Sequence, residues 1–182
     1  DAEVCMMAAD TMEALGIPRG QYVMKVNNRK VLDGLLHSVG MDTVENAEGR
    51  FAVLRAIDKL DRLGIAGVRQ LLGVGRKDES GDFSKGAGLN EEQVSRIISF
   101  LETAIGEVTK ANEGKYFSKD FKKASDEDFY LIDDLMSSFH NNTKMMEGLN
   151  ELMSIHQIVR AAGYGRDRMR FDLAVVRGLE YY

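Results

Sequence analysis

The residue types best suited to chemistry gather in the sequence VVRGLEYY, residues 175–182. Arg177 carries a planar guanidinium that is always charged and is shaped to pair with a carboxylate or a phosphate. Tyr181 and Tyr182 each offer a flat apolar ring and one hydroxyl that can hydrogen-bond to a ligand. Gly178 leaves room beside them for a bound molecule. The chain stops on these residues, so we expect it to be a piece of something larger, with an active site completed elsewhere.

Each of these residues also has an ordinary structural explanation. An arginine at the end of a strand often forms a surface ion pair, and tyrosines often pack on a sheet. In a strand, Tyr181 and Tyr182 would point to opposite faces. One would then touch a ligand and the other would support it, and the sequence does not say which.

Two groups of basic residues are candidates for contact with a phosphate backbone. The first is a lysine-rich run with aromatic neighbours, formed by Lys115, Tyr116, Phe117, Lys119, Phe121, Lys122 and Lys123. A solvated helix face with its apolar side turned inward explains this run better. The second comprises Arg166, Arg168 and Arg170, which would share one face if the final strand began early. Simple solvation explains the arginines equally well.

Other kinds of site lack support in the sequence. The loop at residues 75–88 has glycines and lysines but no GxxxxGK[ST] pattern, so we reject a phosphate-binding loop of that type. His37, His140 and His156 lack the spacing of metal ligands. Cys5 is the only cysteine, which excludes an internal disulfide and fits a reducing compartment. We therefore assign no metal ligand.

Composition is that of an ordinary globular protein. The 182 residues are 44% apolar and 29% charged, with a formal net charge of −5. This mildly acidic balance argues against a general nucleic-acid coat but allows local basic patches. No stretch approaches the ~18 apolar residues of a membrane span, and no signal peptide is visible, so we expect a cytoplasmic protein with no membrane partner.

The spacing of apolar residues predicts a largely helical chain, interrupted by a single proline, Pro18. The predicted helices cover residues 4–15, 31–39, 51–60, 68–72, 94–105, 131–136 and 145–159. Asn28 is a candidate N-cap, and Asn90 with Gln93 has the spacing of a capping box. Residues 74–90 are rich in glycine and charge and predict a long mobile loop. The polar, lysine-rich stretch at residues 109–128 shows no clear helical or strand pattern.

Two strands are predicted, QYVMKV at residues 21–26 and a final strand at residues 170–176. A two-stranded ribbon is marginal by itself in water. We therefore expect an α+β fold, mainly α in this piece, whose strands join a larger sheet.

The run VVRGLEYY resembles the RGLDYY signature of the histidyl-tRNA synthetases, which are class II aminoacyl-tRNA synthetases. Two more stretches agree with it in order and spacing: DAEVCMM at the start and YVMKVNNRKVLDGLL at 22–36. The stretch AIDKLDRLG at 56–64 looks like the start of a helical insertion that occurs in the family. The resemblance implies that residues 1–45 and 166–182 belong to the catalytic core, with their strands in its antiparallel sheet. It implies that residues 46–165 form an inserted helical bundle, which closes over the tRNA acceptor end.

The family joins histidine to ATP, used with Mg²⁺, and then transfers histidine to tRNA(His). By resemblance, Arg177 lies near the histidine carboxylate and the α-phosphate, where a fixed cation offsets developing charge. Tyr181 and Tyr182 would line the pocket for the histidine ring, with Gly178 and Glu180 supporting them. Glu180 stands where the family usually has aspartate, a departure that we interpret as a subtype feature.

The resemblance also implies a homodimer of the full-length protein, and makes tRNA the candidate partner of Lys119, Lys122, Lys123, Arg166 and Arg168. The chain lacks counterparts of the family's motif 2 and motif 3 arginines and of its anticodon-binding domain. We therefore expect neither activity nor a bound cofactor for this chain by itself.

Two alternatives remain. One is the regulatory subunit of ATP phosphoribosyltransferase, a non-catalytic relative that binds histidine as a signal. A subunit that does not form an adenylate has less need of an arginine at position 177. The presence of Arg177 therefore favours the enzyme. The other is an independent helical binding module, which the intact family spacing argues against.

Overall fold

The computed structural model describes residues 1–78, 81–105 and 127–176, and these are mainly helical with two small sheets. The elements are α1 (Ala2–Ala14), β1 (Met24–Val26), α2 (Arg29–Ser38), η1 (Val44–Asn46), α3 (Ala47–Asp58), α4 (Leu60–Leu72), β2 (Gly75–Lys77), β3 (Phe83–Lys85), α5 (Glu91–Ala104), α7 (Glu127–Ser138), α8 (Thr143–Ala161) and β4 (Met169–Phe171). The predicted α+β class, mainly α, is confirmed. Among the described helices, none has the length and apolar character needed to cross a membrane.

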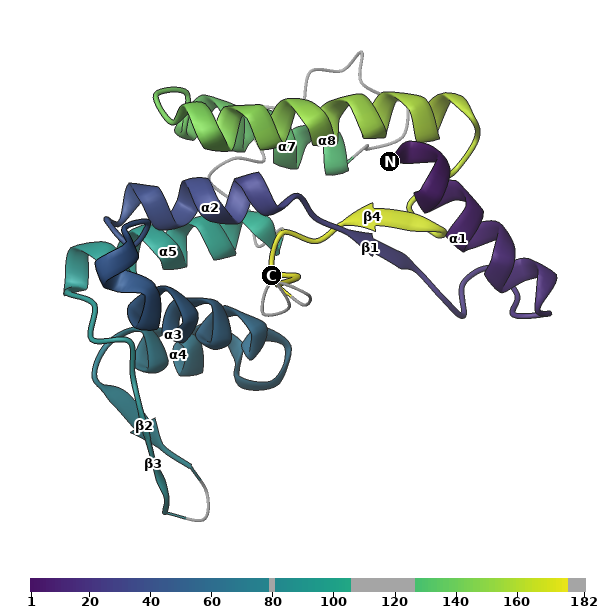
Figure 1. Ribbon diagram of the computed structural model, residues 1–182. Coiled ribbons are helices and arrows are strands. Elements are labelled where there is room, and N and C mark those ends of the chain that lie inside the picture. Colours follow the sequence, from purple (N-terminus) through teal and green to yellow (C-terminus); the bar gives the residue numbers. More distant parts are fainter. Residues whose placement is uncertain (79–80, 106–126, 177–182) are drawn as a thin grey trace, which may run out of the picture.

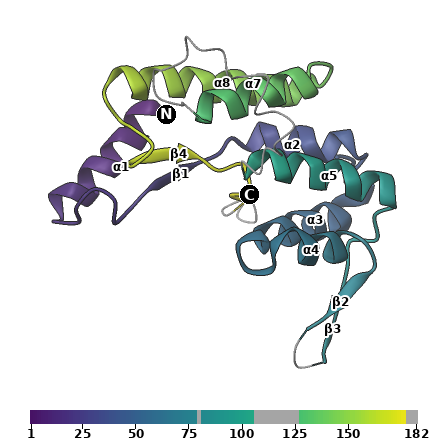
Figure 2. The ribbon, with the colours of Figure 1, turned by 180° about the vertical axis from the view of Figure 1, so that it is seen from behind.

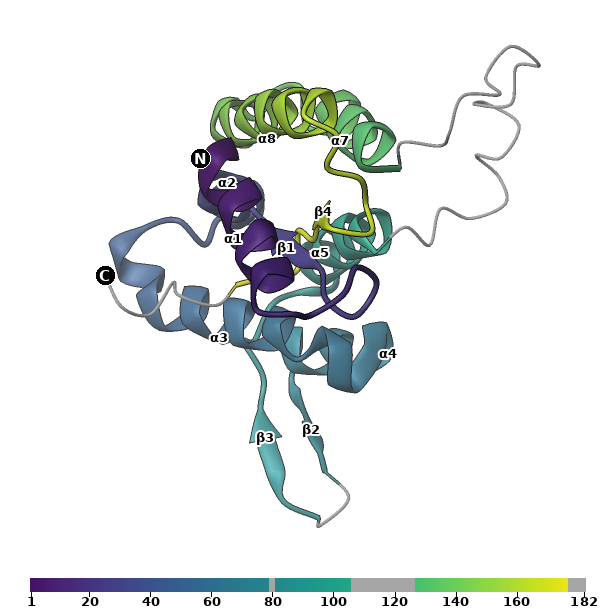
Figure 3. The same ribbon diagram turned by 90° about the vertical axis from the view of Figure 1, so that its right-hand side faces the viewer.

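The helices lie in layers (Figure 1). α7 and α8 lie side by side, α2 packs against α8, and α5 contacts both α4 and α7. The view from behind shows the same order: α2 and α5 lie between the α7–α8 pair above and the α3–α4 pair below (Figure 2). α1 and the β1–β4 pair lie at one end of the molecule (Figure 1). The β2–β3 hairpin projects beyond α3 and α4 (Figure 3).

Among the described helices, three begin with a side-chain cap: α2, α5 and α8. Asn28 accepts a hydrogen bond from the amide of Lys30 at the start of α2. Asn90 and Gln93 form a complete capping box at the start of α5. Both caps are confirmed as the sequence predicts, because capping depends on residues within a single turn. Asn142 caps α8 in the same way.

α2 and α8 pack closely because each carries a glycine at their contact. A carbon added to Gly34 would lie 2.7 Å from the backbone nitrogen of Met145, and one added to Gly148 would lie 2.8 Å from that of Val31. Fully buried side chains surround these glycines: Leu32, Leu35, Leu36, Leu149 and Leu152. This interface joins helices assigned from sequence to different domains, and the division at residues 45 and 165 stays a prediction.

The two predicted core strands pair with each other, but over three residues each. Met24 lies opposite Met169 and Val26 opposite Phe171, in a parallel pair. The sequence assigned both strands to a larger antiparallel sheet and did not predict this parallel pair. A parallel pair requires a long crossover connection, and the helices between β1 and β4 supply it.

The predicted loop over residues 74–90 is also corrected. It contains an antiparallel hairpin in which Gly75 lies opposite Lys85 and Lys77 opposite Phe83. Gly75 has a φ of 116°, and an added side chain would meet the carbonyl oxygen of Ser84 at 2.3 Å. Strands of three residues are too short to show the alternation by which strands are usually recognised.

Candidate active-site segment

The residues predicted to form the active site lie just beyond the described part of the chain. They are Arg177, Gly178, Glu180, Tyr181 and Tyr182, and the predicted tRNA contacts Lys119, Lys122 and Lys123 also lie outside it. Their roles therefore stay predictions. The structure does describe residues 172–176, which lead directly to Arg177 and are called the lead-in segment below.

The lead-in segment turns instead of continuing the strand. The amide of Asp172 still donates to the carbonyl of Val26 at 3.0 Å. The amide of Ala174 then donates to Oδ1 of Asp172 at 3.2 Å, and that of Val175 to the carbonyl of Asp172 at 3.1 Å. An aspartate that accepts from the backbone two residues later stabilises a turn. The prediction of a strand through residue 176 is therefore wrong.

Asn27, directly after β1, ties this turn to the first strand. Its Nδ2 atom donates to the carbonyls of Leu173 at 3.0 Å and of Val175 at 2.9 Å. Its Oδ1 atom accepts from the amide of Asn28 at 2.7 Å. Leu173 and Val176 are buried in the core. The lead-in segment is thus held both by apolar burial and by one amide side chain.

A small open hollow of about 250 Å³ lies beside the lead-in segment. Its lining consists of Lys25, Ile57, Asp58, Leu60, Asp61, Asp172, Ala174 and Val175. The Nζ atom of Lys25 lies 2.7 Å from Oδ2 of Asp172 and 3.7 Å from Oδ2 of Asp61. Ligand pockets are usually larger, about 300–1,000 Å³, and mostly apolar. The hollow by itself therefore does not define a binding site.

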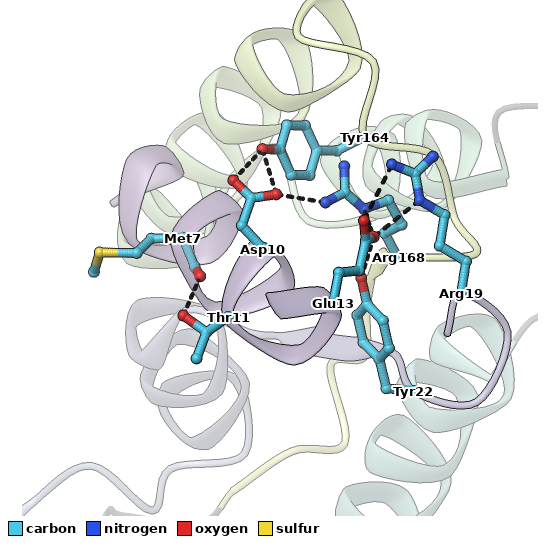
Figure 4. Close-up of polar contacts among 8 residues, drawn as sticks. All are labelled: Met7, Asp10, Thr11, Glu13, Arg19, Tyr22, Tyr164 and Arg168. Carbon is cyan, nitrogen blue, oxygen red and sulfur yellow. Dashed lines mark hydrogen bonds and ion pairs between the residues drawn. The ribbon is translucent and has the colours of Figure 1, made fainter. Parts of the chain in front are cut away.

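Arg168, one residue before β4, lies among polar side chains from α1 and the loop after it (Figure 4). Its Nη2 atom is 2.5 Å from Oδ1 of Asp10, and its Nε atom is 2.7 Å from Oε1 of Glu13. Glu13 also accepts from the hydroxyl of Tyr22 at 2.7 Å. The guanidinium carbon lies 3.9 Å from the centre of the Tyr164 ring. Only 6% of the Arg168 side chain is exposed, so it links α1 to the start of β4.

The cluster shifts the pKa values of its members. The hydrogen bond from Arg19, and next the one from Tyr22, hold the pKa of Glu13 below its ordinary value. Burial by itself lowers the pKa of Arg168, but hydrogen bonds to Tyr22 and Asp10 and the charge of Glu13 outweigh burial and raise it. Glu13 and Arg168 are therefore both charged at neutral pH, which suits an ion pair and not acid–base catalysis.

Acidic side chains of α7 also contact β4 and the residues before it. Arg166 pairs with Glu127, and its Nε atom lies 3.4 Å from Oδ1 of Asp128. Asp128 is 1% exposed, forms an ion pair with Arg160 and accepts from the amide of Phe171 at 3.4 Å. A carboxylate buried this deeply needs such partners. α7 and α8 therefore hold β4 through charged groups.

These contacts do not support the predicted patch in which Arg166, Arg168 and Arg170 share one face of a strand. The shared face required a strand that began early, but β4 begins at Met169. Arg166 and Arg168 lie before the strand and turn to different acidic partners. Contact of either residue with tRNA stays a prediction, and their guanidinium groups already have partners within the chain.

Sequence patterns did not point to Asn27 or Asp128. Asn27 was visible only as half of an Asn-Asn turn, because its partners are 146 and 148 residues away. Asp128 ends the stretch that gave no clear pattern, and a buried carboxylate has no local signature. Lys25 lies within the predicted strand at residues 21–26, but the sequence did not point to its ion pair with Asp172.

Comparison with known proteins gives a consistent result. No protein-family model matches the chain. The whole chain is 52% identical over 182 residues to the histidine–tRNA ligase of Rhizobium meliloti (strain 1021) and 48% identical over 184 residues to that of Rhodopseudomonas palustris (strain TIE-1). It spans 32% and 33% of those two proteins, about a third of the curated relatives that it matches.

A solved structure agrees. The crystal structure of histidyl-tRNA synthetase from Nostoc sp. PCC 7120 matches the whole chain with a TM-score of 0.66 and 25% identity, over 34% of its own chain. The resemblance predicted from VVRGLEYY is confirmed: the chain is homologous, over its full length, to a segment of histidine–tRNA ligases.

Proposed function

We propose that this chain is part of a histidine–tRNA ligase, which forms histidyl-adenylate from histidine and ATP and then passes histidine to tRNA(His). The observation that carries the proposal is the similarity of all 182 residues to one segment of histidine–tRNA ligases. The catalytic signature RGLEYY lies within that similarity. Because the chain spans about a third of those relatives, activity belongs to the longer protein.

Within this proposal, Arg177 acts in the first step. A carboxylate oxygen of histidine attacks the α-phosphorus of ATP, a P–O bond forms, and pyrophosphate leaves with the electrons of the broken bond. Both reactants are anions, so a fixed guanidinium stabilises the charge that gathers between them. One charge-assisted hydrogen bond of this kind contributes about 1.5–3 kcal/mol.

The histidine ring is the proposed ligand of the two tyrosines. A phenol presents an apolar face to the imidazole and a hydroxyl to one of its nitrogens, so Tyr181 and Tyr182 can bind it without an added charge. Gly178 gives the substrate room, and Glu180 supports the segment. ATP enters with Mg²⁺ as a substrate of the longer protein, which we propose to be a cytoplasmic homodimer.

Two features of the structure support a core interrupted by an insertion. β1 and β4 pair although the helices α2 to α8 lie between them in sequence. In addition, Val4 and Met7 of α1 and Leu15 just after it are 61%, 62% and 72% exposed, an apolar surface that further parts of a longer protein can cover. We propose residues 1–45 and 166–182 as core and 46–165 as the inserted helical part, with Lys119, Lys122 and Lys123 as tRNA contacts.

Histidine-dependent exchange of pyrophosphate into ATP tests the proposal. The 182-residue chain is compared with a protein extended at both ends by the segments that its relatives carry. Each is made with the native sequence, with Arg177→Ala, and with Arg62→Ala as a control at an exposed position of α4. We expect exchange only in the extended protein, loss of at least about tenfold in kcat for Arg177→Ala, and native activity for Arg62→Ala.

Other outcomes have clear meanings. If the extended protein binds histidine but never exchanges pyrophosphate, a histidine-sensing regulatory subunit is the better description. If the short chain exchanges pyrophosphate by itself, the requirement for the missing motifs is wrong.

A further inference from the structure

We infer that Asn27 is a positioning residue for the active site: its amide group fixes the path of the lead-in segment and so the direction in which the chain reaches Arg177. This inference rests on the proposed function. It adds to that function a residue outside the RGLEYY signature, 150 positions earlier in the sequence (177 − 27).

The amide of Asn27 uses all of its hydrogen-bonding groups in this contact. An asparagine side chain has two N–H donors and one carbonyl acceptor. Nδ2 donates to the carbonyls of Leu173 and Val175, and Oδ1 accepts from the amide of Asn28. Three partners fix the orientation of the amide plane, so the side chain holds the two carbonyls in a defined place.

Asn27 acts where the pairing of the two strands has ended. The last backbone bond from β1 is the one from the amide of Asp172 to Val26, within the described residues. Beyond that bond, the side chain of Asn27 continues the connection to Leu173 and Val175. The carbonyl of Val175 is bonded to the nitrogen of Val176, which precedes Arg177. A displaced Val175 carbonyl therefore changes the point from which the chain continues to Arg177.

The chemistry of the contact selects asparagine. Aspartate has the same shape and keeps an acceptor for the amide of Asn28, but it would present only acceptors to two carbonyl oxygens. Serine could offer a single donor. Catalytic groups must be held to within about 0.5 Å, and a misplacement of about 1 Å can cost about a hundredfold in rate.

The test uses the extended protein and histidine-dependent pyrophosphate exchange. For Asn27→Asp we expect kcat to fall about tenfold or more at pH 7.5, with KM for ATP changed less than about twofold, because binding contacts remain. As the pH is lowered, the introduced carboxylate gains a proton and can donate one hydrogen bond. The activity of the variant relative to native protein should therefore rise toward acid pH.

Asn142→Asp is the matched control. Asn142 is also half-buried, donates from Nδ2 to the carbonyl of Gly34 at 2.8 Å, and accepts at Oδ1 from the amide of Met145 at 3.0 Å. The substitution removes the same kind of bond from the α2–α8 interface. It should lower the thermal midpoint while leaving kcat per folded molecule unchanged. If Asn27→Asp does not fold, Asn27→Ser keeps one donor and should give an intermediate kcat.

The outcomes separate the inference from the proposed function. Native kcat and a flat relative pH profile in Asn27→Asp, with Arg177→Ala inactive, would overturn the inference alone. An equal loss of kcat in Asn142→Asp would also overturn it, because the effect would then be general destabilisation. Full activity of Arg177→Ala, or no exchange in the native extended protein, would overturn the proposed function and the positioning role with it.

Discussion

The α2–α8 interface and the surroundings of β4 are built from different interactions. At the interface, Gly34 and Gly148 let the helices approach, and buried leucines fill the contact. Around β4, a strand of three residues, Met169 and Phe171 are also buried. Ion pairs and hydrogen bonds from Asp128, Arg168 and Asn27 add to this burial at the strand and at the residues beside it. Close fit between the two helices specifies the first region, and directional polar bonds specify the second.

The difference follows from what each region has to do. Apolar burial is favourable but has no preferred direction, so it suits two helices that must simply stay together. A short strand that leads the chain to a defined place needs directional bonds. Burying charge costs solvation energy, and we interpret Asp128 and Arg168 as residues that specify the course of β4 more than they stabilise the fold.

The largest expected effect comes from Asp128→Ala. The change leaves Arg160, whose side chain is 18% exposed, without the carboxylate that it pairs with, and breaking a buried pair costs about 3–5 kcal/mol. Urea denaturation measures this as a lower free energy of unfolding. Asp133→Ala, at an exposed position of α7, is the control and should change stability by less than about 0.5 kcal/mol. Equal effects of the two would show that the pair at β4 is not special.

Gly34→Ala should come next, with a loss of about 1–3 kcal/mol, because the added methyl meets the backbone of α8. Gly49→Ala is the matched control. Gly49 also lies inside a helix, but its added carbon meets only the flexible end of Met41, at 3.2 Å. The control should be neutral or stabilising, since alanine favours helix by about 1 kcal/mol. A harmless Gly34→Ala would show that shape is not what specifies the interface.

Arg168→Lys should have a smaller effect, about 1 kcal/mol, measured as a lower urea midpoint. Lysine keeps the charge but loses the fork that reaches Asp10 and Glu13 together. Arg19→Lys is the control because Arg19, 56% exposed, contacts the same glutamate from the surface. If Arg168→Lys leaves the urea midpoint unchanged, a positive charge is enough to link α1 to β4. The directional bonds of the guanidinium would then matter less than we propose.

The smallest effect is a change in acid sensitivity. The folded pKa of Glu13 lies below its unfolded value of 4.5, mainly because of Arg19 and then Tyr22. Its contribution to stability is therefore complete above about pH 4.5 and is lost as the pH falls through the lower folded pKa. Glu13→Gln should flatten the fall of the thermal midpoint in this range. Glu102→Gln, at an exposed position of α5, should leave the curve unchanged.

Local features of this protein could be predicted because they depend on neighbours in sequence. Helical spacing located the helices, and the caps at Asn28 and Asn90 were confirmed. The β2–β3 hairpin could not be predicted, since its strands are too short to show a period. The length of the return strand was overestimated because Leu173 and Val176 are apolar and buried, yet Leu173 lies in a turn and Val176 follows it.

The sequence by itself determined the helices, their caps and the resemblance of VVRGLEYY to a catalytic signature, because each is written in adjacent residues. Only the tertiary structure decided that Asn27 meets Leu173 and Val175, and that Arg168 meets Asp10 and Glu13. These partners are separated by well over a hundred residues, and they come together because α1, α8 and β1 pack around the returning chain. Side-chain chemistry sets which contacts are possible, and packing selects the ones that form.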